Sequence, residues 1–306
     1  MAMRLATRGS PLALWQANET RRMLLAAAPA REVELVVVQS AGDKDARTEL
    51  SRFGLTGIFT AEVDHAVLSG RAQAGVHSLK DMPTTLHPDL MLASVLARGA
   101  HEDAFLSATH DSLAALPPGA RVATGSVRRA AMVLAARPDL VVVPIRGNVD
   151  TRLGKLLAGE ADALILARAG LERLGLEVHI KEVLRSPRFL PAPSQGIVGL
   201  VCRRDDGATQ RALGAIGDVE SFAEALAERA LLHDLHGGCN APVGALARAS
   251  ENALAIEARV LSRDGAEVLE DRVRGLLDDA IYLGQELARR LLARGAKRLV
   301  DAAREQ

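Results

Sequence analysis

A strand-like segment runs straight into a helix start at residues 5–17, whose sequence is LATRGSPLALWQA. Ser10 followed by Pro11 is typical of a helix beginning, because serine caps the free N–H groups and proline is tolerated at the first helical position. A strand, a turn and a helix are therefore predicted here, as the first unit of an α/β chain.

Strand and helix patterns alternate along the chain that follows this first unit. Short continuous apolar runs predict buried strands at Val33–Val38, Leu90–Leu96, Val141–Ile145 and Ala163–Ala167. Helices are predicted after Ser10-Pro11 and over roughly Ile58–Leu68 and Val127–Ala136. Alternation of this kind predicts parallel sheets.

Two pairs of similar segments indicate a duplicated architecture. The turn ATRGS at residues 6–10 has a counterpart in ATGS at residues 123–126, and each precedes a predicted helix. Likewise, GRAQA at 70–74 and GEADA at 159–163 each open a predicted strand. We expect two similar α/β domains, with one crossover near 98–102 and a return near 191–196. Two linkers between two domains make a hinge around a cleft.

The pattern changes after about Val219. A predicted helix at 220–234 is followed by strand-like stretches at 243–248, 254–261 and 267–274, and by a helical region at 278–293. Strands grouped between helices predict a small α+β domain. The expected boundaries are 1–97 with 197–216 for the first domain, 101–191 for the second and 219–306 for the third.

Composition excludes several classes of protein. Lys plus Arg equals Asp plus Glu, at 38 each in 306 residues, which argues against a nucleic-acid binder. No apolar run approaches the ~18 residues of a membrane helix, and no signal peptide is evident. The two cysteines, Cys202 and Cys239, match no metal-binding spacing. We expect a cytoplasmic protein without a metal site or a membrane partner.

Three segments could bind anions, and each also has an ordinary interpretation. The two turns before the predicted helices combine hydroxyls, glycine and nearby arginines, which suits anions at helix N-termini but also suits plain capping. Arg146 and Arg152 follow the predicted strand at 141–145, where open α/β sheets collect ligands. The alternative is a solvated loop.

Two further segments carry reactive side chains. Asp81 follows a short apolar strand and stands beside Lys80. It is either a catalytic carboxylate or one half of a solvated ion pair with Lys80. His77 in that strand is interpreted as a core histidine. Cys239 lies in a glycine turn, either as an exposed thiol available for attachment or as a small buried hydrophobe. Cys202, at the end of a predicted strand, is interpreted as structural.

Four segments together resemble the hydroxymethylbilane synthase (porphobilinogen deaminase) family along almost the whole chain. They are LATRGSPLALWQA at 5–17, VHSLKDMP at 76–83, RGNVDTRL at 146–153 and GGC at 237–239. The resemblance implies two α/β domains like those of periplasmic binding proteins around a cleft, plus the small α+β C-terminal domain. It also implies head-to-tail condensation of four porphobilinogen molecules, with loss of ammonia and hydrolytic release of hydroxymethylbilane.

The resemblance also assigns roles to residues. It implies a dipyrromethane cofactor joined to Cys239 through a thioether, with Asp81 as the catalytic residue. Further cofactor-binding positions are implied at Lys80, Asp81, Thr124, Ser126, Arg128, Arg129 and Arg146. Substrate carboxylates are assigned to Arg8, Ser10, Arg146, Arg152, Arg173 and Gln195. A monomer is expected, whose product passes to uroporphyrinogen-III synthase.

The chain departs from the family pattern at a few positions. Thr56 and Ala61 replace lysines of a mobile loop, Ser194 replaces a glycine and Cys202 replaces a glutamate. Two other classes of function stay open at this stage. A non-catalytic two-domain binder of small anions would explain the hinge, and a different transferase would use Cys239 only as a transient nucleophile.

Overall fold

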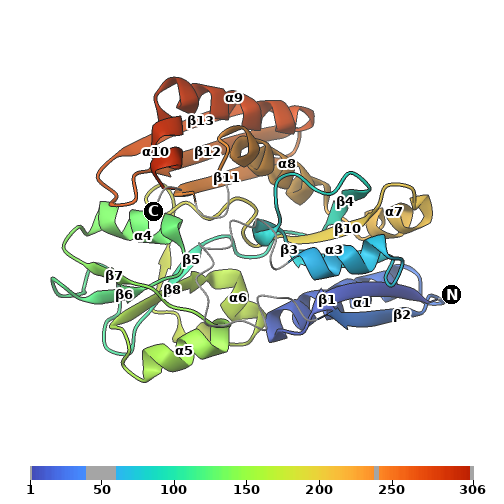
Figure 1. The fold of residues 1–306 in the computed structure, drawn as a ribbon, viewed down its shortest axis with the longest axis horizontal. Helices are drawn as coiled ribbons and strands as arrows, with labels where there is room; N and C mark the ends of the chain where they lie inside the picture. The colour runs from blue at the N-terminus through green and yellow to red at the C-terminus, as the bar shows by residue number, and fades with distance from the viewer. Residues whose placement is uncertain (1, 39–59, 238–240, 304–306) are drawn as a thin grey trace. The chain divides into compact units, whose positions relative to one another are not determined.

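Figure 1 shows the computed structural model, which describes residues 2–38, 60–237 and 241–303. Thr56 and Cys239 therefore lie outside the described residues, as does part of the helix predicted at 58–68. The chain divides into two compact units. Unit 1 comprises Met1–Gly99 and Ile197–Phe222, and unit 2 comprises Ala100–Gly196 and Ala223–Gln306.

Unit 1 is built on a five-stranded sheet with the order β2-β1-β3-β10-β4. The strands are β1 (Met3–Arg8), β2 (Val33–Val38), β3 (Ala74–Ser78), β4 (Leu90–Val95) and β10 (Val198–Arg203). The helices are α1 (Pro11–Ala27), α3 (Ala61–Leu68) and α7 (Gly207–Gly214), with a 3₁₀ turn, η2 (Leu79–Asp81), directly after β3.

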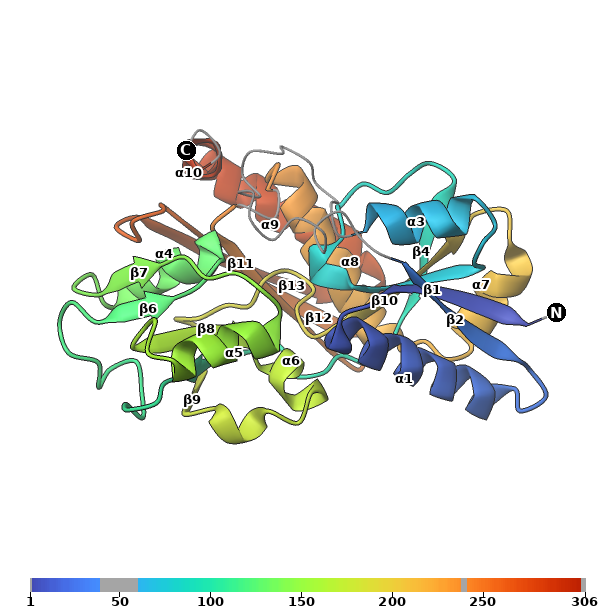
Figure 2. The same ribbon diagram turned by 60° about the horizontal axis from the view of Figure 1, so that its bottom comes forward.

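Helices cover both faces of this sheet because successive side chains of a strand point to opposite faces. Leu5 of β1 packs with Leu24 of α1, whereas the next residue, Ala6, packs with Val63 of α3. Figure 2 shows α1 and α3 on the two sides of the sheet. All four of these side chains are fully or almost fully buried.

Unit 2 contains a second five-stranded sheet, with the order β7-β6-β8-β5-β9. Its strands are β5 (Asp103–Leu106), β6 (Arg121–Ala123), β7 (Val141–Val143), β8 (Ala163–Ala167) and β9 (Glu182–Leu184). Its helices are α4 (Val127–Ala136), α5 (Val149–Leu157) and α6 (Arg168–Arg173), followed by a short 3₁₀ turn, η3 (Glu177–His179). The fold class predicted from the sequence is confirmed in these two α/β sheets.

The expectation of parallel sheets was wrong in one respect, because both sheets are mixed. The first three strands of each order pair in parallel, but β10 is antiparallel to β3 and β4, and β5 is antiparallel to β8 and β9. A βαβ connection within one sheet forces neighbouring strands to be parallel. The strands β5 and β10 each follow a crossover between units instead, so this constraint does not act on them.

Unit 2 also holds a three-stranded antiparallel sheet with the order β11-β12-β13. Its strands are β11 (Val243–Ser250), β12 (Ala253–Leu261) and β13 (Val268–Leu276). The helices around it are α8 (Val219–Asp234), α9 (Ala280–Ala293) after the 3₁₀ turn η4 (Leu277–Asp279), and α10 (Ala296–Ala302). This sheet belongs to the same compact unit as the second α/β sheet. The boundaries of a separate third domain stay a prediction.

Within the described ranges, no helix has the length and apolar character needed to cross a membrane.

Candidate functional site

Unit 1 contains a small pocket where two parallel strands end. The hollow measures about 90 Å³, and its lining includes Arg8, Ser10, Gln16, Ser78 and Asp81. Because β1 and β3 are parallel neighbours, their carboxyl ends meet at one edge of the sheet. Ligands of open α/β sheets bind at that edge.

Local sequence explains how the pocket is formed. Arg8 is the last residue of β1, and Ser10 Oγ caps α1 by accepting a hydrogen bond from Ala13 N at 3.4 Å. Asp81 is exposed at the end of the 3₁₀ turn that follows β3, with Lys80 half-buried before it. The structure therefore brings Arg8, Ser10 and Asp81 together in one pocket.

Two polar contacts involve residues that line this pocket. Gln16 Nε2 donates to Ser78 Oγ at 2.8 Å, and Gln16 is 2% exposed. His77 is 5% exposed, which confirms its interpretation as a core histidine, and its Nε2 lies 3.2 Å from Asp64 Oδ1 of α3. Gln16 and Asp64 were not singled out in the sequence, since each lies on a helix without any motif of its own.

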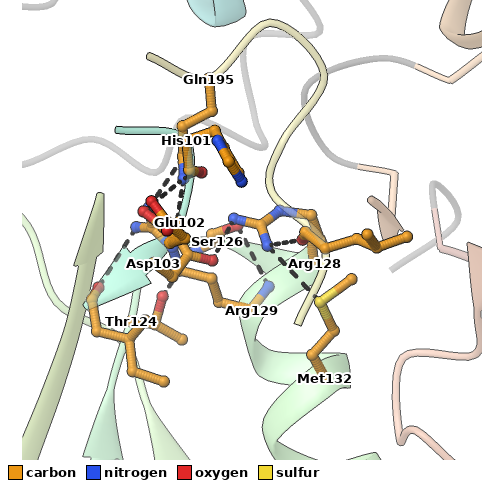
Figure 3. A network of polar contacts seen from close by, with 11 residues as sticks. His101, Glu102, Asp103, Thr124, Ser126, Arg128, Arg129, Met132 and Gln195 are labelled. Atoms are coloured by element: carbon orange, nitrogen blue, oxygen red, sulfur yellow. Dashed lines mark hydrogen bonds and ion pairs between the residues drawn. The ribbon is translucent and has the colours of Figure 1, made fainter. Parts of the chain in front are cut away.

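Unit 2 contains a buried ionic network centred on Asp103 (Figure 3). Arg128 Nη2 lies 2.8 Å from Asp103 Oδ2, and Arg129 donates to Asp103 Oδ1 from Nε at 3.0 Å and from Nη2 at 2.8 Å. Gln195 Nε2 donates to the same Oδ1 at 2.9 Å and to His101 O at 2.8 Å. Gln195 thus fastens the return segment at 191–196 to the segment that enters β5.

The electrostatics of this network favour the ionised carboxylate. Burial by itself would raise the pKa of Asp103, but the charges of Arg128 and Arg129 hold it well below its usual range. Burial lowers the pKa of Arg128, and the charge of Asp103 opposes that shift. All three side chains are buried, at 1% exposure for Asp103, 4% for Arg128 and 6% for Arg129.

The network has the charge needed to hold a carboxylate-bearing group. Two buried guanidinium groups face one buried carboxylate, which leaves one positive charge in excess. Within the described residues, Arg128 Nε is buried without a hydrogen-bond acceptor. A buried charge is costly unless it is paired. The donor set therefore fits a carboxylate-bearing cofactor better than a neutral one.

The N-terminus of α4 lies in this network. Ser126 Oγ accepts a hydrogen bond from Arg129 N at 3.4 Å, and Thr124 Oγ1 accepts one from Ser126 N at 3.2 Å. These bonds are ordinary capping, the alternative considered for this turn. A capped N-terminus still directs its N–H dipoles at an anion, so the two interpretations are compatible.

The remaining predicted arginines of unit 2 lie in a loop or on short helices that follow strands. Arg146 is half-buried in the loop after β7, and Arg152 of α5 donates from Nε to Gly147 O of that loop at 2.8 Å. Arg173, at the end of α6, donates from Nη2 to Gly196 O at 2.6 Å, and burial lowers its pKa. The turn at Thr124 contacts this region, since Thr124 N donates to Val143 O at the end of β7.

Asp103 is the principal residue that the sequence did not reveal. It lies beside the first crossover, where only a change of domain was predicted. Cys202 is fully buried in β10, and burial raises the pKa of its thiol to about 11, so its structural role is confirmed. Among the described residues, no group of three or more acidic, histidine or cysteine side chains could hold a metal ion.

Comparison with known proteins gives two family matches. Residues 3–211 match the model described as "Porphobilinogen deaminase, dipyromethane cofactor binding domain", and residues 222–293 match "Porphobilinogen deaminase, C-terminal domain". The chain is 44% identical over 292 residues to proteins named porphobilinogen deaminase from Bordetella parapertussis and Bordetella bronchiseptica, covering 95% of this chain and 93% of each relative.

Similar solved structures are more distant. The methionine-binding protein MetQ has a TM-score of 0.47 at 12% identity, over 72% of this chain and 92% of its own. The periplasmic VFT2 domain of Bordetella pertussis BvgS has a TM-score of 0.44 at 13% identity, over 70% of this chain and 86% of its own.

Proposed function

The chain belongs to the porphobilinogen deaminase family, transferases of tetrapyrrole biosynthesis, and we propose that it joins four porphobilinogen molecules head to tail. One ammonia is released at each addition, and hydrolysis frees linear hydroxymethylbilane at the end. The primer of this proposal is a dipyrromethane bound through a thioether to Cys239. That residue lies outside the described part of the chain.

The observation that carries the proposal is the excess of buried positive charge around Asp103. Arg128 and Arg129 together carry one more charge than Asp103 neutralises, next to the capped start of α4. A pyrrole chain bears an acetate and a propionate on each ring, so its carboxylates would neutralise this excess positive charge. We assign the cofactor carboxylates to Arg128, Arg129 and Arg146, with further bonds from Lys80, Thr124 and Ser126.

The bound dipyrromethane supplies the pyrrole carbon to which the first substrate is joined. Asp81 accepts a hydrogen bond from the pyrrole N–H of porphobilinogen. Its negative charge stabilises the positive charge that develops on the substrate as ammonia departs. The pocket in unit 1 supports this role, because Asp81 lines it together with Arg8 and Ser10.

Arginines would position the substrate carboxylates. We assign this task to Arg8, Arg146, Arg152 and Arg173, together with Ser10 and Gln195. Each hydrogen bond to a charged group contributes about 1.5–3 kcal/mol. Guanidinium groups suit the task because their planar forks match carboxylates. The bond from Gln195 to Asp103 supports a second contribution, the positioning of Arg129.

Intact mass of the purified protein tests the proposal. From cells that make porphobilinogen, the wild-type chain should carry the mass of one dipyrromethane. Cys239→Ser should lack that mass and Cys202→Ser, the matched control at the other cysteine, should keep it. An unmodified wild-type chain would sink the primer hypothesis. A binding protein without catalysis predicts no ammonia release, and a transient thiol nucleophile predicts turnover without a stable adduct.

Three finer statements belong to the same proposal. We infer a cytoplasmic protein, a monomer, and transfer of the product to uroporphyrinogen-III synthase. The first two are checked by fractionation of the source cells and by light scattering. The third is checked by coupling the two enzymes and following cyclised product.

A further inference from the structure

The three-stranded sheet of unit 2 has one face covered by helices and one face partly open. Ala245, Ala247 and Ile256 point into the hydrophobic cluster that also contains Leu283 and Leu287 of α9. The strand register places the alternate residues on the opposite face. Two adjacent rows across that face are Leu246–Glu257–Arg272 and Arg248–Ala255–Arg274.

One end of this open face is closed by α4 and its neighbours. Leu246 and Leu261 are buried in the cluster that contains Met132 and Leu190. A Cβ added at Gly244 would come within 2.5 Å of Met132 Cε. Beyond Leu246 the face opens into a hollow of about 490 Å³. That volume lies within the range of small-molecule sites, about 300–1,000 Å³.

The hollow has a basic wall and an apolar floor. Arg248, Arg272 and Arg274 are exposed around it, and only Glu257 offers a negative charge, with Oε1 3.4 Å from Arg248 Nη1. Over the described ranges, Arg272 and Arg274 have no ion pair and no side-chain hydrogen bond. Three arginines against one glutamate leave two positive charges in excess, on a chain whose formal net charge is zero.

Strand geometry sets the spacing of these charges. Arg248 and Arg274 flank Ala255, so their backbones are two strand spacings apart, about 10 Å. Arg272 and Arg274 are two residues apart on one strand, about 7 Å. Ala255 is short and leaves the space between the arginines empty. A ligand of several ångströms, with anionic groups at its rim and carbon at its centre, matches this layout.

We propose that this hollow is a binding site for a small organic polycarboxylate, separate from the site assigned to the deaminase reaction. Guanidinium forks bind carboxylates in two parallel hydrogen bonds. The floor of Leu246 and Ala255 favours a ligand with an apolar skeleton over an inorganic polyphosphate. The hollow offers side-chain donors from a sheet face, and no helix N-terminus of the kind that phosphates favour is among its lining residues.

Isothermal titration with mellitate, a benzene ring bearing six carboxylates, tests the site in the full-length protein with its cofactor. The double variant Arg272→Gln/Arg274→Gln should lose one binding event per chain, or bind there at least tenfold more weakly. The control Arg22→Gln/Arg289→Gln removes the same charge from arginines that are 67% and 70% exposed on other surfaces. Its isotherm should equal that of the wild type.

Several results would overturn the site. One is an isotherm of Arg272→Gln/Arg274→Gln that equals that of the wild type. Another is an equal loss of mellitate binding in the control variant, which would indicate that mellitate binds exposed arginines in general. Tripolyphosphate binding as tightly as mellitate would make the site one for inorganic anions. Hexaglutamate binding tenfold more tightly than mellitate would make it a docking surface for an acidic protein segment. Deaminase turnover should be the same in both double variants, and its loss in Arg272→Gln/Arg274→Gln would show that the hollow is not separate.

Discussion

The two units start a helix after a strand in nearly the same way, yet they handle the neighbouring arginines differently. In unit 1, Arg8 precedes the cap Ser10 and lines an open pocket beside the exposed Asp81. In unit 2, Arg128 and Arg129 follow the cap Ser126 and are buried against Asp103. Arg8 is the last residue of β1, whereas Arg128 and Arg129 lie in the first turn of α4, on its buried face.

From this difference we expect the two regions to serve different purposes. The arginines of unit 2 are held by a buried carboxylate and by Gln195, so little ordering is needed when an anion binds. The pocket of unit 1 presents its carboxylate to solvent, where successive substrates can reach it. We expect permanent binding to depend on unit 2 and turnover to depend on unit 1.

The largest effect should come from Asp81→Ala. Turnover should fall by about 10²–10⁴-fold, because a positioned carboxylate contributes about that much to catalysis. Stability to urea should be unchanged, since Asp81 is exposed. Asp89→Ala, another exposed aspartate of unit 1, is the control and should keep its turnover. Near-normal turnover in Asp81→Ala would remove this residue from the mechanism.

Asp103→Ala should act on stability instead. It leaves Arg128 and Arg129 buried without their carboxylate, and breaking a buried pair in this way costs about 3–5 kcal/mol. Urea unfolding of the variant measures that loss. Asp139→Ala removes the partner of Arg137 from an exposed pair and should have a much smaller effect. Equal midpoints for the two variants would mean that the network around Asp103 does not hold unit 2 together.

Lowering the pH should weaken the same network, with a smaller loss of stability than Asp103→Ala causes. The pKa of Asp103 is lowered in the folded state, so the unfolded chain binds the proton more tightly and stability rises with pH. The contribution of Asp103 to the free energy of unfolding is fully present above its pKa in the unfolded chain, about 3.9, and is lost as the pH falls below that value. Urea unfolding between pH 6 and pH 3 measures the free energy of unfolding of the wild type and of Asp103→Asn. The difference between these two free energies should narrow below pH 4. A constant gap would contradict the assignment.

The smallest effect concerns the segment that brings Gln195 to Asp103. Ser194 has a φ of +64°, and its N–H donates to the buried Glu228. Ser194→Gly should stabilise the protein by about 0.5–1 kcal/mol, since glycine adopts positive φ without strain. Glu251→Gly, at φ +56° in the turn between β11 and β12, is the matched control and should gain a similar amount. A loss of stability in Ser194→Gly alone would show that its buried hydroxyl contributes to the fold.

Much of the fold followed from local patterns. The apolar run at 33–38 and the helix at 127–136 were predicted with the bounds that the structure has. The short strands β5, β6 and β9 were missed, because three or four residues leave no clear period. The helical region predicted at 278–293 corresponds to η4 and α9. The last helix, α10, begins after Gly295, whose φ is +93°, and was not predicted.

The candidate site was predicted unevenly for a physical reason. Arg8, Ser10 and Asp81 stand within recognisable turns, so their place at strand ends could be predicted. Asp103 could not, because its partners are 25 and 26 residues away and no pattern links them before the chain folds. The same holds for Gln16 and Ser78, which meet across 62 residues.

The sequence by itself determined the family, the α/β character and the residues at strand ends, since these depend on local periodicity and on motifs readable along the chain. Only the tertiary structure decided which arginines are buried, that β5 and β10 run antiparallel, and that three arginines of the last sheet share one open face. Those features depend on burial and on strand register. Both arise when distant segments pack together, because the free energy of a charge depends on what surrounds it.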